Sequence, residues 1–121
     1  MRFLLITQDP EMLAMAREGL HPSDELRAFK RWQEALEASA GVDMMFVDLL
    51  STLTESGKIA GYEEFAMAKM AHPDAADVPL VLISPPPDYE LDFMAGWPDF
   101  VLGNIQQPVS AKLFRRASTW V

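Results

Sequence analysis

The chain has 121 residues, of which 50% are hydrophobic and 23% are charged, and this balance is typical of one globular domain with a single core. It contains no cysteine, which excludes disulfides, thiolate metal sites and cysteine nucleophiles. The net charge of −8 argues against nucleic-acid binding, and no apolar run approaches the roughly 20 residues of a membrane helix, so we expect one cytoplasmic domain over residues 1–121.

The first half of the chain alternates between apolar runs and helical patterns. Residues 3–6 (FLLI) form a continuous apolar run that predicts a buried parallel strand. Pro10 suits the first turn of the following helix, where its missing N–H removes no hydrogen bond, and residues 25–29 predict a second strand. A short helix then begins at Trp32. Residues 44–48 (MMFVD) predict the most apolar strand, which ends in its aspartate.

The second half continues this alternation with weaker signals. We expect a polar loop over residues 51–61, followed by a helix that contains Phe65 and ends at His72. Residues 78–83 (VPLVLI) predict a fourth strand, which ends at Ser84. Most of the methionines fall at core-facing positions of the expected helices and strands, where we expect them to be packing residues. The last three expected elements are a short helix at 89–94, a strand at 100–102 and a helix at 111–120.

Strands that alternate with helices predict an α/β domain with a parallel sheet covered on both faces. The segments VDMMFVDLL (42–50) and HPDAADVPLVLIS (72–84), with the Ala95-Gly96 pair, resemble the response-regulator receiver (CheY-like) family across essentially the whole chain. The resemblance implies a single flavodoxin-like, doubly wound domain. Its sheet would have five parallel strands in the order 2-1-3-4-5, with helices on both faces and a short or degenerate fourth helix.

The resemblance also assigns roles to individual residues. Asp48 falls on the position of the aspartate that accepts a phosphoryl group in the family, and Ser84, Phe100 and Gln107 fall on the positions that respond to it. In the family, two acids at the end of the first strand hold a magnesium ion, and a lysine precedes the proline after the fifth strand. Here Gln107 stands at the lysine position. Thr7 and Gln8 occupy the two acid positions, and the nearest acid, Asp9, lies one position later.

These departures predict an atypical receiver, or pseudo-receiver. Phosphoryl transfer to a carboxylate depends on positioning and on neutralising charge, and an uncharged glutamine cannot replace lysine in that role. We therefore expect no cofactor. A magnesium ion, with Asp48 and Asp9 as its candidate ligands, is expected only if phosphorylation is retained.

The leading hypothesis is a non-enzymatic two-component signalling module that binds a protein partner or a second copy of itself. The expected contact face comprises the short helix at 89–94, the fifth strand and the final helix. The acidic balance favours a partner with basic or mixed charge. Two alternatives stay open: a phosphorylatable receiver with Asp48 as the phosphoacceptor, and a small-molecule sensor that uses the crevice above Asp48. The aromatic residues that either anchor the contact face or fill the core are Tyr89, Phe93, Trp97 and Trp120.

Overall fold

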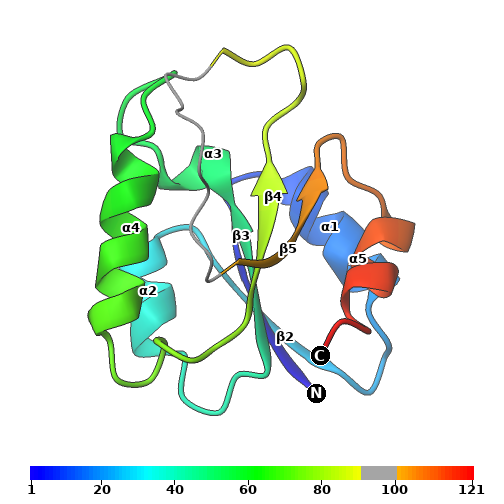
Figure 1. Cartoon of the computed structure of the whole chain (residues 1–121). Helices are drawn as coiled ribbons and strands as arrows, with labels where there is room; N and C mark the ends of the chain where they lie inside the picture. The colour runs from blue at the N-terminus through cyan, green and yellow to red at the C-terminus, as the bar shows by residue number, and fades with distance from the viewer. Residues whose placement is uncertain (91–100) are drawn as a thin grey trace.

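The computed structural model describes residues 1–90 and 101–121. Within these residues, five parallel strands form one sheet in the order β2-β1-β3-β4-β5, with helices on both faces (Figure 1). The predicted doubly wound, flavodoxin-like architecture and strand order are therefore confirmed. In chain order the elements are β1 (Arg2–Ile6), α1 (Pro10–Gly19), β2 (Glu25–Phe29), α2 (Trp32–Glu37), β3 (Met44–Asp48), α3 (Leu49–Thr52), α4 (Ala60–Ala71), β4 (Leu80–Ser84), β5 (Val101–Gln106) and α5 (Ala111–Ala117).

Several expectations fall outside the described residues. They concern most of the expected helix at 89–94, the Ala95-Gly96 pair, and the aromatic residues Phe93, Trp97 and Phe100. Among the helices that the structure does describe, none combines the length and the apolar character that a membrane crossing requires.

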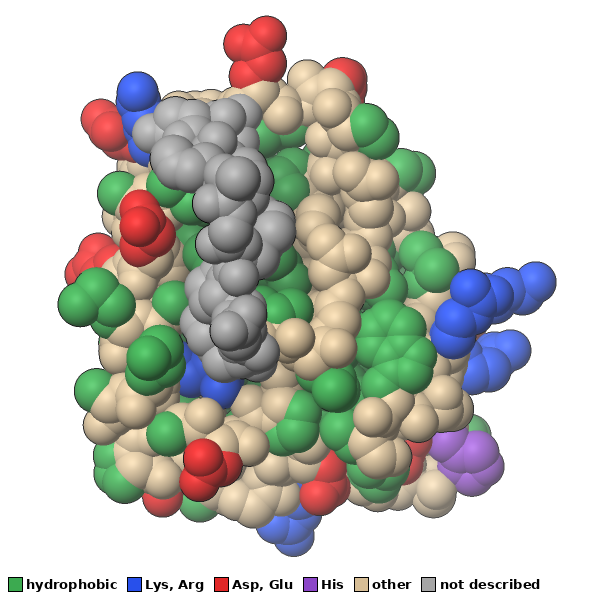
Figure 2. Space-filling view, viewed as in Figure 1, with side chains coloured by type: hydrophobic (Ala, Val, Ile, Leu, Met, Phe, Trp, Pro, Cys, Tyr) green, Lys and Arg blue, Asp and Glu red, His purple; other side chains and the backbone are tan. Residues whose placement is uncertain are grey.

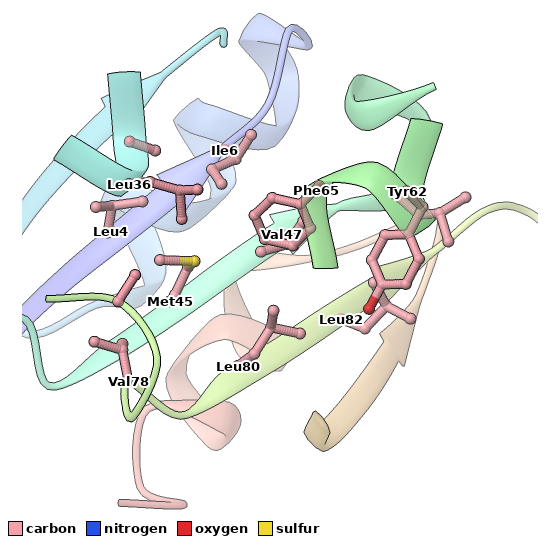
Figure 3. Packing of buried hydrophobic residues seen from close by; sticks show 13 residues of the cluster. Leu4, Ile6, Leu36, Met45, Val47, Tyr62, Phe65, Val78, Leu80 and Leu82 are labelled. Carbon is pink, nitrogen blue, oxygen red and sulfur yellow. The ribbon is translucent and has the colours of Figure 1, made fainter. Parts of the chain in front are cut away.

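The core consists of two apolar layers, one on each face of the sheet. Side chains alternate between the faces along a strand, so Leu4 and Ile6 point to one layer and Phe3 and Leu5 to the other. Helices α2, α3 and α4 cover the first layer, which Figure 3 shows from close by. Helices α1 and α5 cover the second. Because β1, β3 and β4 are covered on both faces, their sequences are continuously apolar.

The two helices on the second face approach each other closely. A Cβ atom at Gly19, the last residue of α1, would collide with the carbonyl oxygen of Ala111, the first residue of α5. Helix α5 begins at a serine cap, where the Ser110 hydroxyl accepts a hydrogen bond from the N–H of Leu113 at 3.3 Å. Glycine at the end of α1 is therefore required by packing and not by backbone conformation.

The segment expected to be a polar loop contains a short helix, α3, and is shorter than expected. Asp48 caps α3 by accepting a hydrogen bond from the N–H of Leu50 at 3.2 Å, which the apolar pattern of the strand did not reveal. Helix α4 begins at Ala60, so Gly61 lies inside it and not in the loop. A Cβ atom at Gly61 would lie 2.8 Å from the backbone nitrogen of Thr54, so this glycine lets α4 pack directly against the chain that follows α3.

Strand β5 is longer than the three residues predicted. It extends to Gln106 and pairs with β4, with Ile105 beside Ile83. Its glycine and asparagine have low strand propensity, so the hydrogen bonds to β4 define the strand and its composition does not reveal it. The final helix ends at Ala117, three residues earlier than predicted. Trp120 follows it, and its ring lies against Gly103 of β5.

Two methionines of α4 lie on the surface and are exceptions to the expectation that most methionines pack in the core. Met67 and Met70 are 72% and 61% exposed, whereas Met44 and Met45 on β3 are buried as predicted. Helix α4 carries apolar residues on nearly all of its sides, so periodicity does not identify its buried face. Larger side chains such as Phe65 occupy the core instead.

Candidate functional site

The carboxyl ends of the strands bring together several of the residues singled out from the sequence. Such ends form the ligand crevice of open parallel sheets. Thr7 follows β1, Asp48 is the last residue of β3, and Gln107 follows β5. Thr7 and Asp48 are buried, at 5% and 3% exposed, and Gln107 is partly buried.

Both carboxylate oxygens of Asp48 accept hydrogen bonds from the chain itself. Oδ2 accepts from the hydroxyls of Thr7 and Ser51, each at 2.9 Å. Oδ1 accepts from the N–H of Leu50 at 3.2 Å and from the side-chain amide of Gln107 at 3.1 Å. None of these four donors carries a charge. The buried carboxylate is thus satisfied by neutral groups from three separate parts of the fold.

The two hydroxyls are themselves held in place by backbone N–H groups. Thr7 Oγ1 accepts from the N–H of Asp9 at 3.0 Å, and Ser51 Oγ accepts from the N–H of Gln8 at 2.8 Å. A hydroxyl that accepts one bond while it donates another has little freedom to rotate. The turn between β1 and α1 therefore aims both hydroxyl protons at Asp48, and the bonds form a connected network.

Burial raises the pKa of Asp48 above its usual range, and this is the largest effect on that pKa. The bonds from Ser51, Thr7 and the N–H of Leu50 act in the opposite direction, because they stabilise the charged form, and the nearby charge of Asp9 adds a smaller upward shift. Since the pKa remains raised, the folded state disfavours the carboxylate despite its four donors.

The other residues singled out from the sequence use their side chains elsewhere. The Gln8 amide donates to the carbonyl oxygen of Lys30 at 3.4 Å. The Asp9 carboxylate caps α1 by accepting from the N–H of Glu11 at 2.9 Å. Ser84 Oγ accepts from the side-chain amide of Asn104 at 2.7 Å and makes no hydrogen bond to Asp48 among the described contacts. Phe100 lies outside the described residues.

Ser51 is a side chain of the network that the sequence did not lead us to predict. It follows Asp48 by three residues and lies in the first turn of α3, which Asp48 caps. A side chain at this position of a helix lies close to the cap residue, as the capping-box pattern illustrates. The spacing of Asp48 and Ser51 could have revealed the contact, but only if α3 had been predicted.

Asp48 and Asp9 are the candidate ligands of a magnesium ion expected from the sequence, and the structure shows how each carboxylate is used. Magnesium needs an octahedral shell of oxygens, usually with one or two carboxylates. Asp48 is the one carboxylate in the network, and its oxygens already accept four hydrogen bonds. The Asp9 carboxylate caps α1. Over residues 1–90 and 101–121, no group of three or more His, Cys, Asp or Glu side chains could hold a metal ion.

Comparison with known proteins supports the fold. No family model and no curated protein matches the chain. Its structure is similar to a signal receiver domain of two-component signal transduction (histidine kinase) from Clostridium thermocellum, with a TM-score of 0.64 and 11% identity over 97% of this chain and 93% of that one. It is also similar to a sensor protein from Polaromonas sp. JS666, with a TM-score of 0.62 and 20% identity over 99% of this chain and 98% of that one.

A third similar structure is the N-terminal domain of a response regulator receiver protein from Methanoculleus marisnigri JR1. The TM-score is 0.57, and the identity is 15% over 99% of this chain and 94% of that one. The alignments cover nearly the full length of both partners in each of these comparisons. The described residues therefore have the fold of receiver domains.

Proposed function

We propose that this chain is a non-catalytic signalling module of the two-component receiver type, which works by binding other proteins and without phosphorylation of Asp48. The observation that supports this proposal most directly is the set of four neutral donors on the Asp48 carboxylate. A phosphoryl group attached to Asp48 would have to displace some of these donors. It would bring negative charge into a buried site where no donor is a cation.

The glutamine at position 107 strengthens this conclusion. Its amide reaches Asp48 in the same way that a lysine at this position could, but it carries no charge to neutralise a phosphoryl oxygen. Loss of one preorganised electrostatic group commonly lowers a rate by about 100-fold or more. The side chains of Thr7 and Gln8 add a second such loss, because neither supplies a carboxylate for a metal.

The second part of the proposal concerns the binding face, which we assign to β5 and the C-terminal end of the chain. Trp120 is 37% exposed there, beside Leu102 and Val121 at 45% each, and tryptophan is a typical anchor of interfaces. Tyr89 has a different role, because its hydroxyl accepts a hydrogen bond from the N–H of Gly57 at 2.8 Å. That bond ties the chain after β4 to the loop before α4.

Intact-mass spectrometry tests the first part of the proposal. The purified domain is incubated with magnesium and acetyl phosphate beside an Asp48→Asn variant, and we expect no phosphoryl adduct on either. A Thr7→Asp/Gln8→Asp/Gln107→Lys variant restores the acids and the lysine of the family pattern, and an adduct on it shows that the assay can detect one. An adduct on the unmutated protein that Asp48→Asn abolishes would refute the proposal and establish the phosphorylatable receiver instead.

The two alternatives each have one supporting observation. Phosphorylation is favoured by the position of Asp48 at the end of β3 in a receiver fold. Small-molecule sensing is favoured by a hollow of about 540 Å³ beside the network, lined by Asp9, Met12 and Gln107 among others. A ligand in that hollow would raise the melting temperature. An Ala14→Trp variant, at an exposed residue that also lines the hollow, would block it and lose the effect.

A further inference from the structure

The outward face of α4 has an acidic half and an apolar half. Residues three and four apart are neighbours on a helix, so Glu63, Glu64, Met67 and Met70 form one continuous exposed stripe, which we call the α4 stripe. Its carboxylates lie in the first half of the helix and its methionines in the second. Met67 and Met70 are the two most exposed large hydrophobic side chains among the described residues.

Further carboxylates border the methionine end of the α4 stripe. His72, which ends α4, lies 3.4 Å from Glu37 at the end of α2, and the Glu37 side chain is 80% exposed. Asp74 follows two residues later and is also exposed. The two methionines therefore lie between acidic residues at both ends, an apolar centre with a charged rim.

The basic residue of α4 does not neutralise this surface. Lys69 is 1% exposed, and its ammonium group donates to the carbonyl oxygen of Val78 at 2.8 Å on the inner side of the helix. Figure 2 shows hydrophobic and acidic side chains next to one another over α4, at the left of the view, with basic atoms at the top of that side, and it shows basic side chains that project over α5 at the right. The α4 stripe and the α5 side of the molecule thus carry opposite charge.

We infer that the α4 stripe is a docking site for a basic amphipathic helix of a partner protein. Apolar side chains of that helix cover Met67 and Met70, and its lysines or arginines pair with Glu63, Glu64 and Glu37. Methionine suits the centre of such a site because it is unbranched, flexible and polarizable, and so adapts to the shape of a partner. Charge complementarity selects the partner. The inference rests on the proposed role of the domain as a binding module but not on the state of Asp48.

Binding of a defined probe tests the inference. The probe is a synthetic amphipathic helix with leucine on one face and lysine on the other, and its affinity for the full chain is measured by calorimetry at low and high salt. We expect Met67→Gln/Met70→Gln to weaken binding about tenfold or more, which is the effect of losing an interface hot spot. Glu63→Gln/Glu64→Gln should weaken binding and reduce its salt dependence.

A matched control separates docking from general attraction to an acidic protein. Glu11→Gln/Glu18→Gln removes the same charge from exposed positions on α1 and should leave the affinity unchanged. An equal loss with this control, or unchanged binding by the methionine variant, would overturn the inference. The partner would instead be a second copy of the chain if sedimentation shows self-association that Met67→Gln/Met70→Gln abolishes. A phosphoryl adduct on Asp48 would refute the proposed function and leave this result standing.

Discussion

Replacing Thr7 by valine should expose how much the domain depends on the network around Asp48. The two side chains have nearly the same shape, so Thr7→Val removes the hydroxyl with little change in packing. The hydroxyl donates to Asp48 at 2.9 Å and accepts from the N–H of Asp9 at 3.0 Å. The variant leaves the carboxylate with three donors in a site where Asp48 is 3% exposed.

The expected loss of stability follows from these contacts. A hydrogen bond to a charged group contributes about 1.5–3 kcal/mol, and burying a methyl group in place of the hydroxyl recovers less than about 1 kcal/mol. We therefore expect Thr7→Val to lower the free energy of unfolding at pH 7 by about 2 kcal/mol. Urea unfolding followed by circular dichroism measures this difference, provided that the transition is two-state.

The pH dependence of the loss identifies its cause. Burial already raises the pKa of Asp48 above 3.8 in the folded protein, and the Thr7 bond counteracts this, so Thr7→Val raises the pKa further. The folded state is therefore penalised most at neutral pH, where the group is a carboxylate. As the pH falls through the raised folded value towards 3.8, the carboxyl group takes up a proton and the penalty disappears. The difference between variant and wild type should shrink over that window.

A Thr7→Ser variant is the control for this experiment. It keeps the donor and loses only a buried methyl group, which should lower stability by about 1 kcal/mol at every pH. If Thr7→Val lowers stability by less than about 0.5 kcal/mol at pH 7, or by the same amount at all pH values, the carboxylate does not depend on the Thr7 bond and the reasoning fails.

Three further substitutions test the packing and the second buried charge. Gly61→Ala should destabilise the domain by about 2 kcal/mol in urea unfolding, because the new Cβ meets backbone atoms, and a smaller loss would show that α4 can shift. Phe114→Ala removes a fully buried ring that packs edge-on against Phe46 at 5.2 Å and should lower stability by about 3–5 kcal/mol without changing the urea m-value. Burial lowers the pKa of Lys69 below 10.5, so the folded state disfavours its charged form. Wild-type stability should therefore rise as the pH rises from the lowered value towards 10.5. Lys69→Met should lack this rise, and identical pH curves for the two proteins would contradict the assignment.

The sequence predicted the central part of the fold because burial on both faces leaves a strong signal. Strands β1, β3 and β4 are continuous apolar runs, and their bounds differ little from the prediction. Strand β5 was predicted too short because it contains Gly103 and Asn104, which have low strand propensity. These two residues are part of the strand because they pair with β4. Helix α3 was missed because a single turn capped by Asp48 has no periodicity to detect.

The site was predictable in its location but not in its contacts. Parallel strands end at one edge, so Thr7, Asp48 and Gln107 could be expected to meet there. Which side chains turn inward depends on competing partners that no local pattern specifies. Asp9 is used by the cap of α1, and Ser84 is used by Asn104 on the neighbouring strand. The exposure of Met67 and Met70 was unpredictable for a related reason, since α4 is apolar on nearly every side.

The hydrogen bonds to Asp48 bear on whether such a domain can switch between two chemical states. A residue that can be modified and restored gives each molecule two states, and a cell can then record a recent event in the fraction of molecules that carry the mark. Here the chain itself supplies every group on the carboxylate, from the end of β1, from α3 and from the end of β5. Under the proposed function, in which Asp48 is not phosphorylated, such a domain has a single state. Its signal would then depend on the number of copies made and on the partner surfaces that bind them.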